Sequence, residues 1–354
     1  MRWSPLIILI LALSVSAQSG RVKPPEPTGP VVKPSPKPSG AYNPTDLKKT
    51  AADPAATPTP TPAPSDEVIR VDSTLVPIPV SVVDRDGRPV MTLKLEDFEL
   101  RIDGRPVEIG DISRSETPLR LAMLFDNSGS VLSAREFEVK AAVRFFERVV
   151  RPERDLTALF SVATASRLEQ GLTNDISSLT RAIQSFPPPI GATALLDGIV
   201  KGSLYLGEVQ GRRVIVIVSD GDDTYSDATL AQAVRALQVA NCQVYVVKTT
   251  EFENFKRTGS RRGNANVRQL AAERRMLEIA AQTGGKVYSP IDEDELDEAF
   301  RQIASELSQQ YVLSYYPDPE KESSGQFREI TLSVKAKPGY SVRTRKGYYV
   351  PRRF

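Results

Sequence analysis

Apolar and polar residues alternate with a period of two near both ends of the chain. The alternation runs over 76–82 and 98–102 and returns over 330–334. This pattern predicts strands with one buried face. Pro77 and Pro79 predict an edge position for the first of these strands, because proline cannot donate a hydrogen bond to a neighbouring strand.

The middle of the chain follows a different pattern. Residues 121–125 and 214–218 are continuous apolar runs, which are typical of strands buried on both faces. An apolar residue at every fourth position from 137 to 149 predicts the buried face of a helix. Strand-like and helix-like segments alternate over 116–309, which predicts an α/β fold: a doubly wound, mostly parallel sheet with helices on both faces.

Neither terminal set of strands is long enough to bury a core alone, so we expect both sets to form one small β-sandwich into which the α/β domain is inserted. Before the first strand, a short apolar stretch ends in small residues and resembles a secretory signal peptide. A proline-rich segment then predicts a disordered linker. The expected organisation is signal peptide 1–17, linker 18–66, sandwich 67–115, α/β domain 116–309 and sandwich 310–354.

Composition narrows the classes of function. The net charge of +2 gives no broad positive field, so we expect no nucleic-acid partner. The chain has no histidine, which excludes Ser-His-Asp and Cys-His nucleophile systems. Its single cysteine, Cys242, cannot form an intrachain disulfide. No later apolar run is long enough to span a membrane, so the chain is expected to be secreted, periplasmic or in the cell envelope after signal cleavage.

One segment of the α/β region is strongly basic. Residues 252–268 carry five lysines and arginines and a single glutamate. We expect this segment to be an exposed insertion, which is either a solvated loop or a surface for an acidic partner.

Oxygen-bearing side chains follow the predicted strands. Asp126, Ser128 and Ser130 come directly after the run at 121–125, Asp220 follows the run at 214–218, and Thr193 stands at an expected helix start. Open α/β sheets bind ligands at the carboxyl ends of their strands, and hard divalent cations prefer oxygen ligands. The same residue types are common in turns and helix caps, but their order along the chain favours a metal site.

With these residues the chain resembles the von Willebrand factor type A family, and residues 68–354 are similar to von Willebrand A-related proteins of Acidobacteria. The family's metal-ion-dependent adhesion site is an Asp-x-Ser-x-Ser motif plus a distant Thr and Asp. The resemblance implies that Ser128, Ser130 and Thr193 bind the metal directly, and that Asp126 and Asp220 act mostly through water. The implied cofactor is Mg²⁺, with Mn²⁺ and Ca²⁺ as alternatives.

The resemblance implies an adhesion or assembly module, not an enzyme, whose metal captures an Asp or Glu side chain of a protein ligand. Two alternatives stay open. The segment beginning at Asp220 resembles the Asp-x-Asp-x-Thr motif of haloacid-dehalogenase-type phosphatases, in which Asp220 and Asp222 would carry the reaction. The second alternative is a structural scaffold of the cell envelope whose metal site is non-functional. The sequence does not indicate an oligomeric state.

Overall fold

The computed structural model describes residues 75–114, 117–132, 134–261, 266–318, 323–335 and 339–350. All of them fall within one compact unit, Ile69–Phe354. The predicted signal peptide 1–17 and linker 18–66 lie outside the described residues. None of the helices in the described part of the chain combines the length and the apolar character needed to cross a bilayer.

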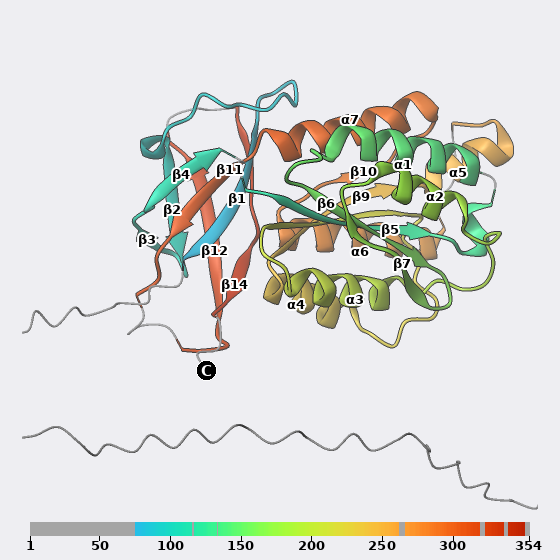
Figure 1. The fold of residues 1–354 in the computed structure, drawn as a ribbon. Coiled ribbons are helices and arrows are strands. Elements are labelled where there is room, and N and C mark those ends of the chain that lie inside the picture. The colour runs from blue at the N-terminus through green and yellow to red at the C-terminus, as the bar shows by residue number, and fades with distance from the viewer. Residues whose placement is uncertain are drawn as a thin grey trace, which may run out of the picture. The chain divides into compact units, whose positions relative to one another are not determined.

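A six-stranded sheet forms the centre of the α/β region (Figure 1). Its strand order is β10-β9-β8-β5-β6-β7. All neighbouring pairs are parallel except β6 and β7. The strands are β5 (Leu119–Asp126), β6 (Leu156–Val162), β7 (Ser166–Thr173), β8 (Arg212–Ser219), β9 (Cys242–Lys248) and β10 (Val287–Tyr288).

The predicted fold class is therefore confirmed, with one strand added. The sequence did not predict β7, because its side chains are mixed in polarity and lie half-buried or exposed at the sheet edge. An antiparallel edge strand needs no continuous apolar run, so period and hydropathy do not reveal it.

Helices cover both faces of this sheet (Figure 1). One face packs against α1 (Arg135–Val149), α2 (Ile176–Gln184) and α7 (Glu293–Ser308). The other packs against α3 (Leu195–Gly207), α4 (Leu230–Val239) and α6 (Val267–Thr283). The apolar run of β5 serves both cores, since Leu121 and Met123 point to the first face and Ala122 and Leu124 to the second.

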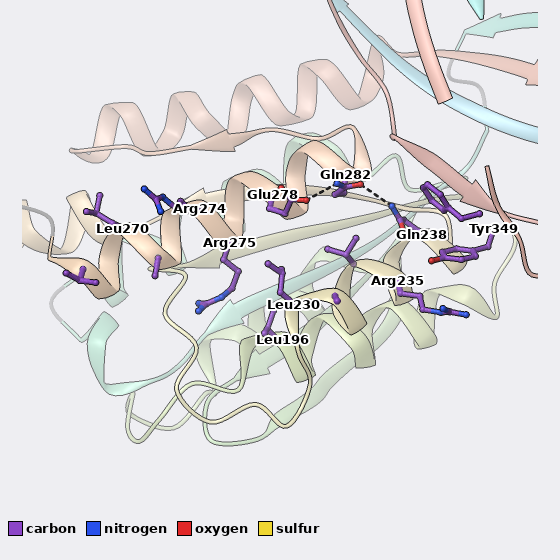
Figure 2. Close-up of a pocket in the computed structure, with 15 residues that line it drawn as sticks. Leu196, Leu230, Arg235, Gln238, Leu270, Arg274, Arg275, Glu278, Gln282 and Tyr349 are labelled. Carbon is purple, nitrogen blue, oxygen red and sulfur yellow. Dashed lines mark hydrogen bonds between the residues drawn. The ribbon is translucent and has the colours of Figure 1, made fainter. Parts of the chain in front are cut away.

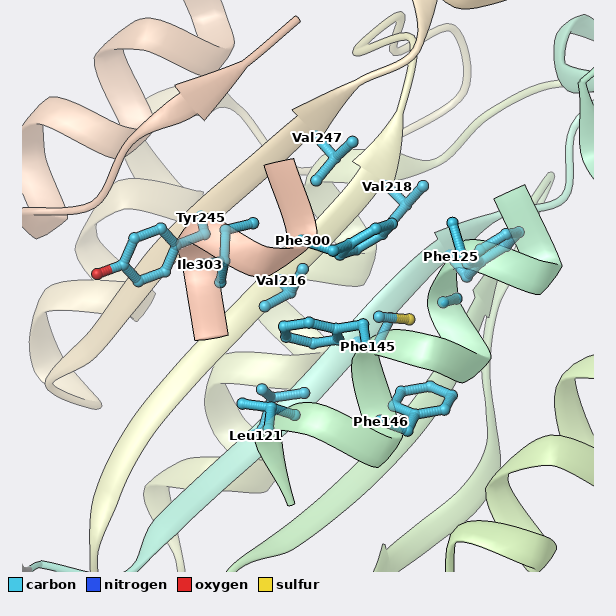
Figure 3. Close-up of a cluster of buried hydrophobic side chains, with 14 of the residues drawn as sticks. Leu121, Phe125, Phe145, Phe146, Val216, Val218, Tyr245, Val247, Phe300 and Ile303 are labelled. Atoms are coloured by element: carbon cyan, nitrogen blue, oxygen red, sulfur yellow. The ribbon is translucent and has the colours of Figure 1, made fainter. Parts of the chain in front are cut away.

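The first core is rich in aromatic rings (Figure 3). Phe145 of α1 and Phe300 of α7 lie with ring centroids 5.1 Å apart. The buried face of α1 differs slightly from the predicted one: Phe137 is only partly buried, and Glu138 beside it is buried. The other predicted positions, Ala141, Phe145 and Val149, are buried as expected, and the buried face is wider than predicted because it also includes Glu138.

Two four-stranded antiparallel sheets complete the unit. Their strand orders are β13-β1-β11-β4 and β14-β12-β2-β3, and their inner faces share one hydrophobic core. Each sheet combines strands from before and after the α/β region, as predicted for a sandwich that contains an insertion. The strands are β1 (Val76–Val83), β2 (Phe98–Ile102), β3 (Arg105–Val107), β4 (Asp111–Arg114), β11 (Tyr311–Tyr315), β12 (Phe327–Val334), β13 (Ser341–Arg343) and β14 (Gly347–Tyr349).

The prediction of an edge position for β1 was wrong. This strand lies between β13 and β11, but β13 pairs only with residues 81–83. Beside the prolines, side chains replace a neighbouring strand: the Thr344 hydroxyl donates to the Pro79 carbonyl at 2.8 Å, and Arg345 donates to the Pro77 carbonyl at 2.7 Å. An interior strand therefore tolerates Pro77 and Pro79, because these contacts require only carbonyl acceptors.

The prediction of an exposed insertion over 252–268 was also wrong for its first part. Residues Thr250–Thr258 form helix α5, and Phe252 is fully buried against the first core. The Phe252 ring lies edge-on to Phe137, with centroids 6.4 Å apart, and the Lys256 ammonium lies 3.5 Å from the Phe137 ring centroid. One buried phenylalanine and a cation–π contact dock this helix despite its basic composition.

Candidate metal centre

The first predicted loop leaves the sheet at the end of β5. Asp126 is buried, and its two oxygens accept from the Ser128 backbone NH at 2.9 Å and from the Ser219 hydroxyl at 2.5 Å. Ser128 is also buried, and its hydroxyl oxygen lies 3.0 Å from that of Ser130, which is exposed. The side-chain oxygens therefore form a line from the sheet interior toward solvent.

The second loop carries Thr193 and is held beside the first by main-chain hydrogen bonds. The Gly129 NH donates to the Gly191 carbonyl at 3.3 Å, and the Ile190 NH donates to the Asn127 carbonyl at 3.2 Å. Gly191 has a φ of +85°, and a Cβ there would approach the Thr164 hydroxyl to 2.7 Å, so only glycine fits this turn. The two loops thus have a fixed separation.

Thr193 itself is buried and lies two residues before the first residue of α3. The predicted start of the helix at Thr193 is therefore two residues too early. The N-terminus of α3 is instead capped from the third loop, where the Asp223 carboxylate accepts from the Leu195 NH at 2.9 Å. This role of Asp223 was not predicted from the sequence, although an acidic residue is a favourable partner for a helix N-terminus.

The third loop follows β8 and contacts the second loop directly. Thr193 and Thr224 exchange two hydrogen bonds, and the Tyr225 NH also donates to the Thr193 carbonyl at 3.0 Å. Asp220 accepts from the Asp222 NH at 2.9 Å. Ser130 and Asp220 line the same cavity of about 380 Å³, together with Asp222 and Thr250. The structure therefore gathers the three predicted loops at one edge of the sheet.

The electrostatics of this edge fit a divalent cation. Burial, followed by the nearby Asp220 carboxylate, raises the pKa of Asp126 to about 6. A cation between two carboxylates would remove that repulsion. Within the described residues, no group of three or more Asp, Glu, Cys or His side chains is arranged to hold a metal. The donor set predicted from the sequence is of a different kind, since three of its five members are the hydroxyls of Ser128, Ser130 and Thr193.

Two charged residues of α1, Arg135 and Glu138, interact with the Asp126 carboxylate and were not predicted from the sequence. Burial, followed by the carboxylates of Glu253 and Asp126, raises the pKa of Glu138 well above its usual value. The Arg135 guanidinium lies 4.5 Å from the centroid of the Phe125 ring. The helical spacing of apolar residues does not reveal a buried glutamate, because glutamate normally lies on the solvent-exposed face of a helix. The raised pKa favours the protonated, neutral form of the Glu138 side chain.

Comparison with known proteins supports the resemblance over part of the chain. Residues 121–222 match the family model of the von Willebrand factor type A domain. This range begins in β5 and includes all five predicted ligands. The fold of the α/β region is consistent with that family. No curated protein matches the chain.

Several solved structures are similar to parts of the chain. The PilB minor pilin from Streptococcus sanguinis aligns at 14% identity and a TM-score of 0.42, covering 58% of this chain and 64% of the pilin. This chain thus spans less than two thirds of the pilin. An aerotolerance-related membrane protein from Bacteroides fragilis aligns at 20% identity and a TM-score of 0.40, covering 53% of this chain and 98% of that one. The vWF domain of the type V pili tip protein Mfa5 from Porphyromonas gingivalis aligns at 20% identity and a TM-score of 0.30, covering 32% and 43%.

Proposed function

We propose that this protein is a secreted or periplasmic adhesion or assembly module of the Acidobacteria-type von Willebrand A-related class. In this proposal Asp126, Ser128, Ser130, Thr193 and Asp220 hold a divalent cation, most readily Mg²⁺, which captures an Asp or Glu side chain of a partner protein. The observation that supports it is the convergence of three loops, far apart in sequence, at the carboxyl edge of one parallel sheet.

The donor set accounts for the choice of ligand. Ser128, Ser130 and Thr193 offer neutral hydroxyls, and Asp126 and Asp220 contribute mostly through bound water. A cation held this way keeps most of its positive charge, so a carboxylate from outside is a favourable further ligand. Asp126 anchors the arrangement because Ser219 and the Ser128 NH fix both of its oxygens.

The surface around the candidate site supports a protein ligand over a small metabolite. Each of the three loops exposes one large apolar side chain: Leu132 after the first, Ile190 on the second and Tyr225 on the third. Apolar residues that remain exposed beside polar ligand groups are typical of protein-binding surfaces. A partner that presents its carboxylate among apolar side chains would bury all three.

The phosphatase alternative receives less support. Asp222, the second aspartate of its motif, forms an ion pair with Arg268. The aspartates follow β8, whereas β5, the first strand of the sheet along the chain, ends in the Asp126 loop. An enzyme that used Asp220 and Asp222 would leave Asp126, Ser128 and Thr193 without a function. The scaffold alternative differs from our proposal in one respect, since it requires no response to metal.

Capture of a partner tests the proposal. The full chain, immobilised and exposed to an envelope extract in Mg²⁺, should retain a specific protein that EDTA releases. The Ser130→Ala variant should retain little of it, whereas Ser177→Ala, an exposed serine on α2 outside the candidate site, should retain it fully. Retention that is equal in Mg²⁺ and EDTA would favour the scaffold alternative.

A further inference from the structure

A second concave surface lies between helices α4 and α6. It encloses about 1230 Å³. Figure 2 shows Leu270, Arg274 and Glu278 on α6 opposite Leu230 and Arg235 on α4, with Tyr349 of β14 at one end. We call this surface, lined by these residues with Leu196, Val234, Gln238, Val267, Arg275, Gln282 and Phe327, the α4/α6 groove.

The apolar residues of the groove are not part of the core. Helix α6 already packs Met276 and Ile279 against the sheet, and Ala272 on the same helix is also buried. Val267 and Leu270 lie on another face, at the i, i+3 spacing, and are 84% and 46% exposed. Helix α6 therefore has two apolar faces, of which one is buried and the other open to solvent.

The charge of the groove is predominantly positive. Arg235, Arg274 and Arg275 line it, against the single carboxylate of Glu278. Arg275 donates to the Gly221 carbonyl at 2.8 Å, and the Arg235 guanidinium lies 4.9 Å from the Tyr349 ring centroid. The structure shows no ion pair between these three arginines and a carboxylate of the described residues. An acidic ligand would supply the missing partners.

The length of the groove is sufficient for a short helix. Its lining on α6 runs from Val267 to Gln282, about 22 Å at 1.5 Å per residue, which is about four helical turns. Across the groove, Gln282 joins the two walls, since it donates to Glu278 at 2.8 Å and accepts from Gln238 at 3.3 Å. Of these two bonds, the one from Gln238 connects α4 to α6, and the one to Glu278 lies within α6 and orients the Gln282 amide.

We propose that the α4/α6 groove binds an acidic amphipathic helix of a partner protein. The apolar stripe of that helix would cover Leu230, Val267 and Leu270, and carboxylates beside the stripe would pair with Arg235 and Arg274. This is the helix-in-groove mode of recognition, in which residues at i, i+3, i+4 and i+7 anchor the ligand. The proposal does not depend on the metal centre.

A selection followed by a binding measurement tests it. The full chain would be used to select from a phage-displayed library of helical peptides, in EDTA so that the metal centre does not contribute. We expect the enriched peptides to share a three-to-four-residue apolar period and a net negative charge. Fluorescence anisotropy of a selected peptide should show at least a tenfold loss of affinity in Leu270→Asp and in Arg274→Glu, and a loss when salt is raised.

Leu277→Asp is the matched control, because Leu277 lies on the same helix, is 50% exposed, and does not line the groove. It should bind the peptide like the wild type. Basic or aperiodic peptides, or an equal effect of Leu270→Asp and Leu277→Asp, would overturn the proposal. A concentration-dependent dimer that Leu270→Asp abolishes would also overturn it, since a second copy of the chain would then occupy the groove.

Discussion

Thr193 and Thr224 are joined by two reciprocal hydrogen bonds. The Thr224 NH donates to the Thr193 carbonyl at 2.9 Å, and the Thr193 NH donates to the Thr224 hydroxyl at 3.0 Å. The two residues belong to the second and third loops of the candidate metal centre. Their contact fixes the main chain of Thr193, so the position of its hydroxyl depends on a residue outside the predicted ligand set.

This contact predicts a positioning role for Thr224. Thr224→Ala removes the hydroxyl acceptor, and we expect Mg²⁺ affinity to fall about tenfold, as for residues that orient a metal ligand. Thr224→Ser keeps the hydroxyl and should retain wild-type affinity. Isothermal titration of both variants checks this. Equal affinity in Thr224→Ala and Thr224→Ser would show that the Thr193 backbone is held without this bond.

The buried glutamate predicts a specific pH dependence of stability. The raised pKa of Glu138 means that the native state keeps a proton that the unfolded state releases near pH 4.5. The free energy of unfolding should therefore fall as pH rises from there to the raised native pKa, by up to about 1.4 kcal/mol per pH unit. Glu138→Gln cannot titrate and should lose this slope in urea unfolding measured in EDTA.

Glu136→Gln is the control for that measurement. Glu136 lies on the same helix but is fully exposed, and its hydrogen bond with Lys140 lowers its pKa. Its replacement should leave the slope between pH 5 and 8 as in the wild type, on the order of experimental error. If the wild type and Glu138→Gln have the same slope, Glu138 is ionised in the native protein.

The contact between the α/β region and β13 predicts a large stability effect. Glu306 of α7 is buried, and its carboxylate accepts from Tyr245 at 2.7 Å and from Arg343 at 2.6 Å. Arg343→Leu would leave that carboxylate without its cation, so we expect a loss of about 2–4 kcal/mol in chemical unfolding. The exposed pair of Arg301 and Glu298 is the comparison: Arg301→Leu should cost less than about 1 kcal/mol.

The phosphatase alternative predicts an activity that we do not expect. Since Asp222 is paired with Arg268, the purified protein should release no more phosphate from an aryl phosphate in Mg²⁺ than its Asp220→Asn variant does. A colorimetric phosphate assay of the two proteins checks this. Phosphate release by the wild type alone would assign Asp220 a catalytic role.

The sequence predicted those elements whose signal is carried by their own residues. β5 and β8 are continuous apolar runs that end in polar residues, and both ends of each strand were placed within a few positions. The first and third loops of the candidate site were predicted together because parallel strands bring their carboxyl ends to one edge, and Thr193 was added from the family resemblance. The ligand roles of the five residues remain predictions.

The features that were missed depend on neighbours distant in sequence. β7 is an edge strand of mixed polarity, and α5 is docked by the buried Phe252 and by the contact of Lys256 with the Phe137 ring. The interior position of β1 depends on Thr344 and Arg345, which lie more than 260 residues later. Glu138 is buried by the packing of α1, which its own pattern does not specify. Each of these features is determined by tertiary contacts, so a local sequence pattern does not predict it.

The central claim is that five side chains from three loops bind one divalent cation. Isothermal titration of the full chain with Mg²⁺ tests it most directly, beside Ser128→Ala, Ser130→Ala and Thr193→Ala. We predict one site in the wild type, affinities at least about tenfold weaker in each variant, and unfolding temperatures in EDTA within about 2 °C of the wild type. The absence of a saturable site for Mg²⁺, Mn²⁺ and Ca²⁺, or unchanged affinity in all three variants, would contradict the claim.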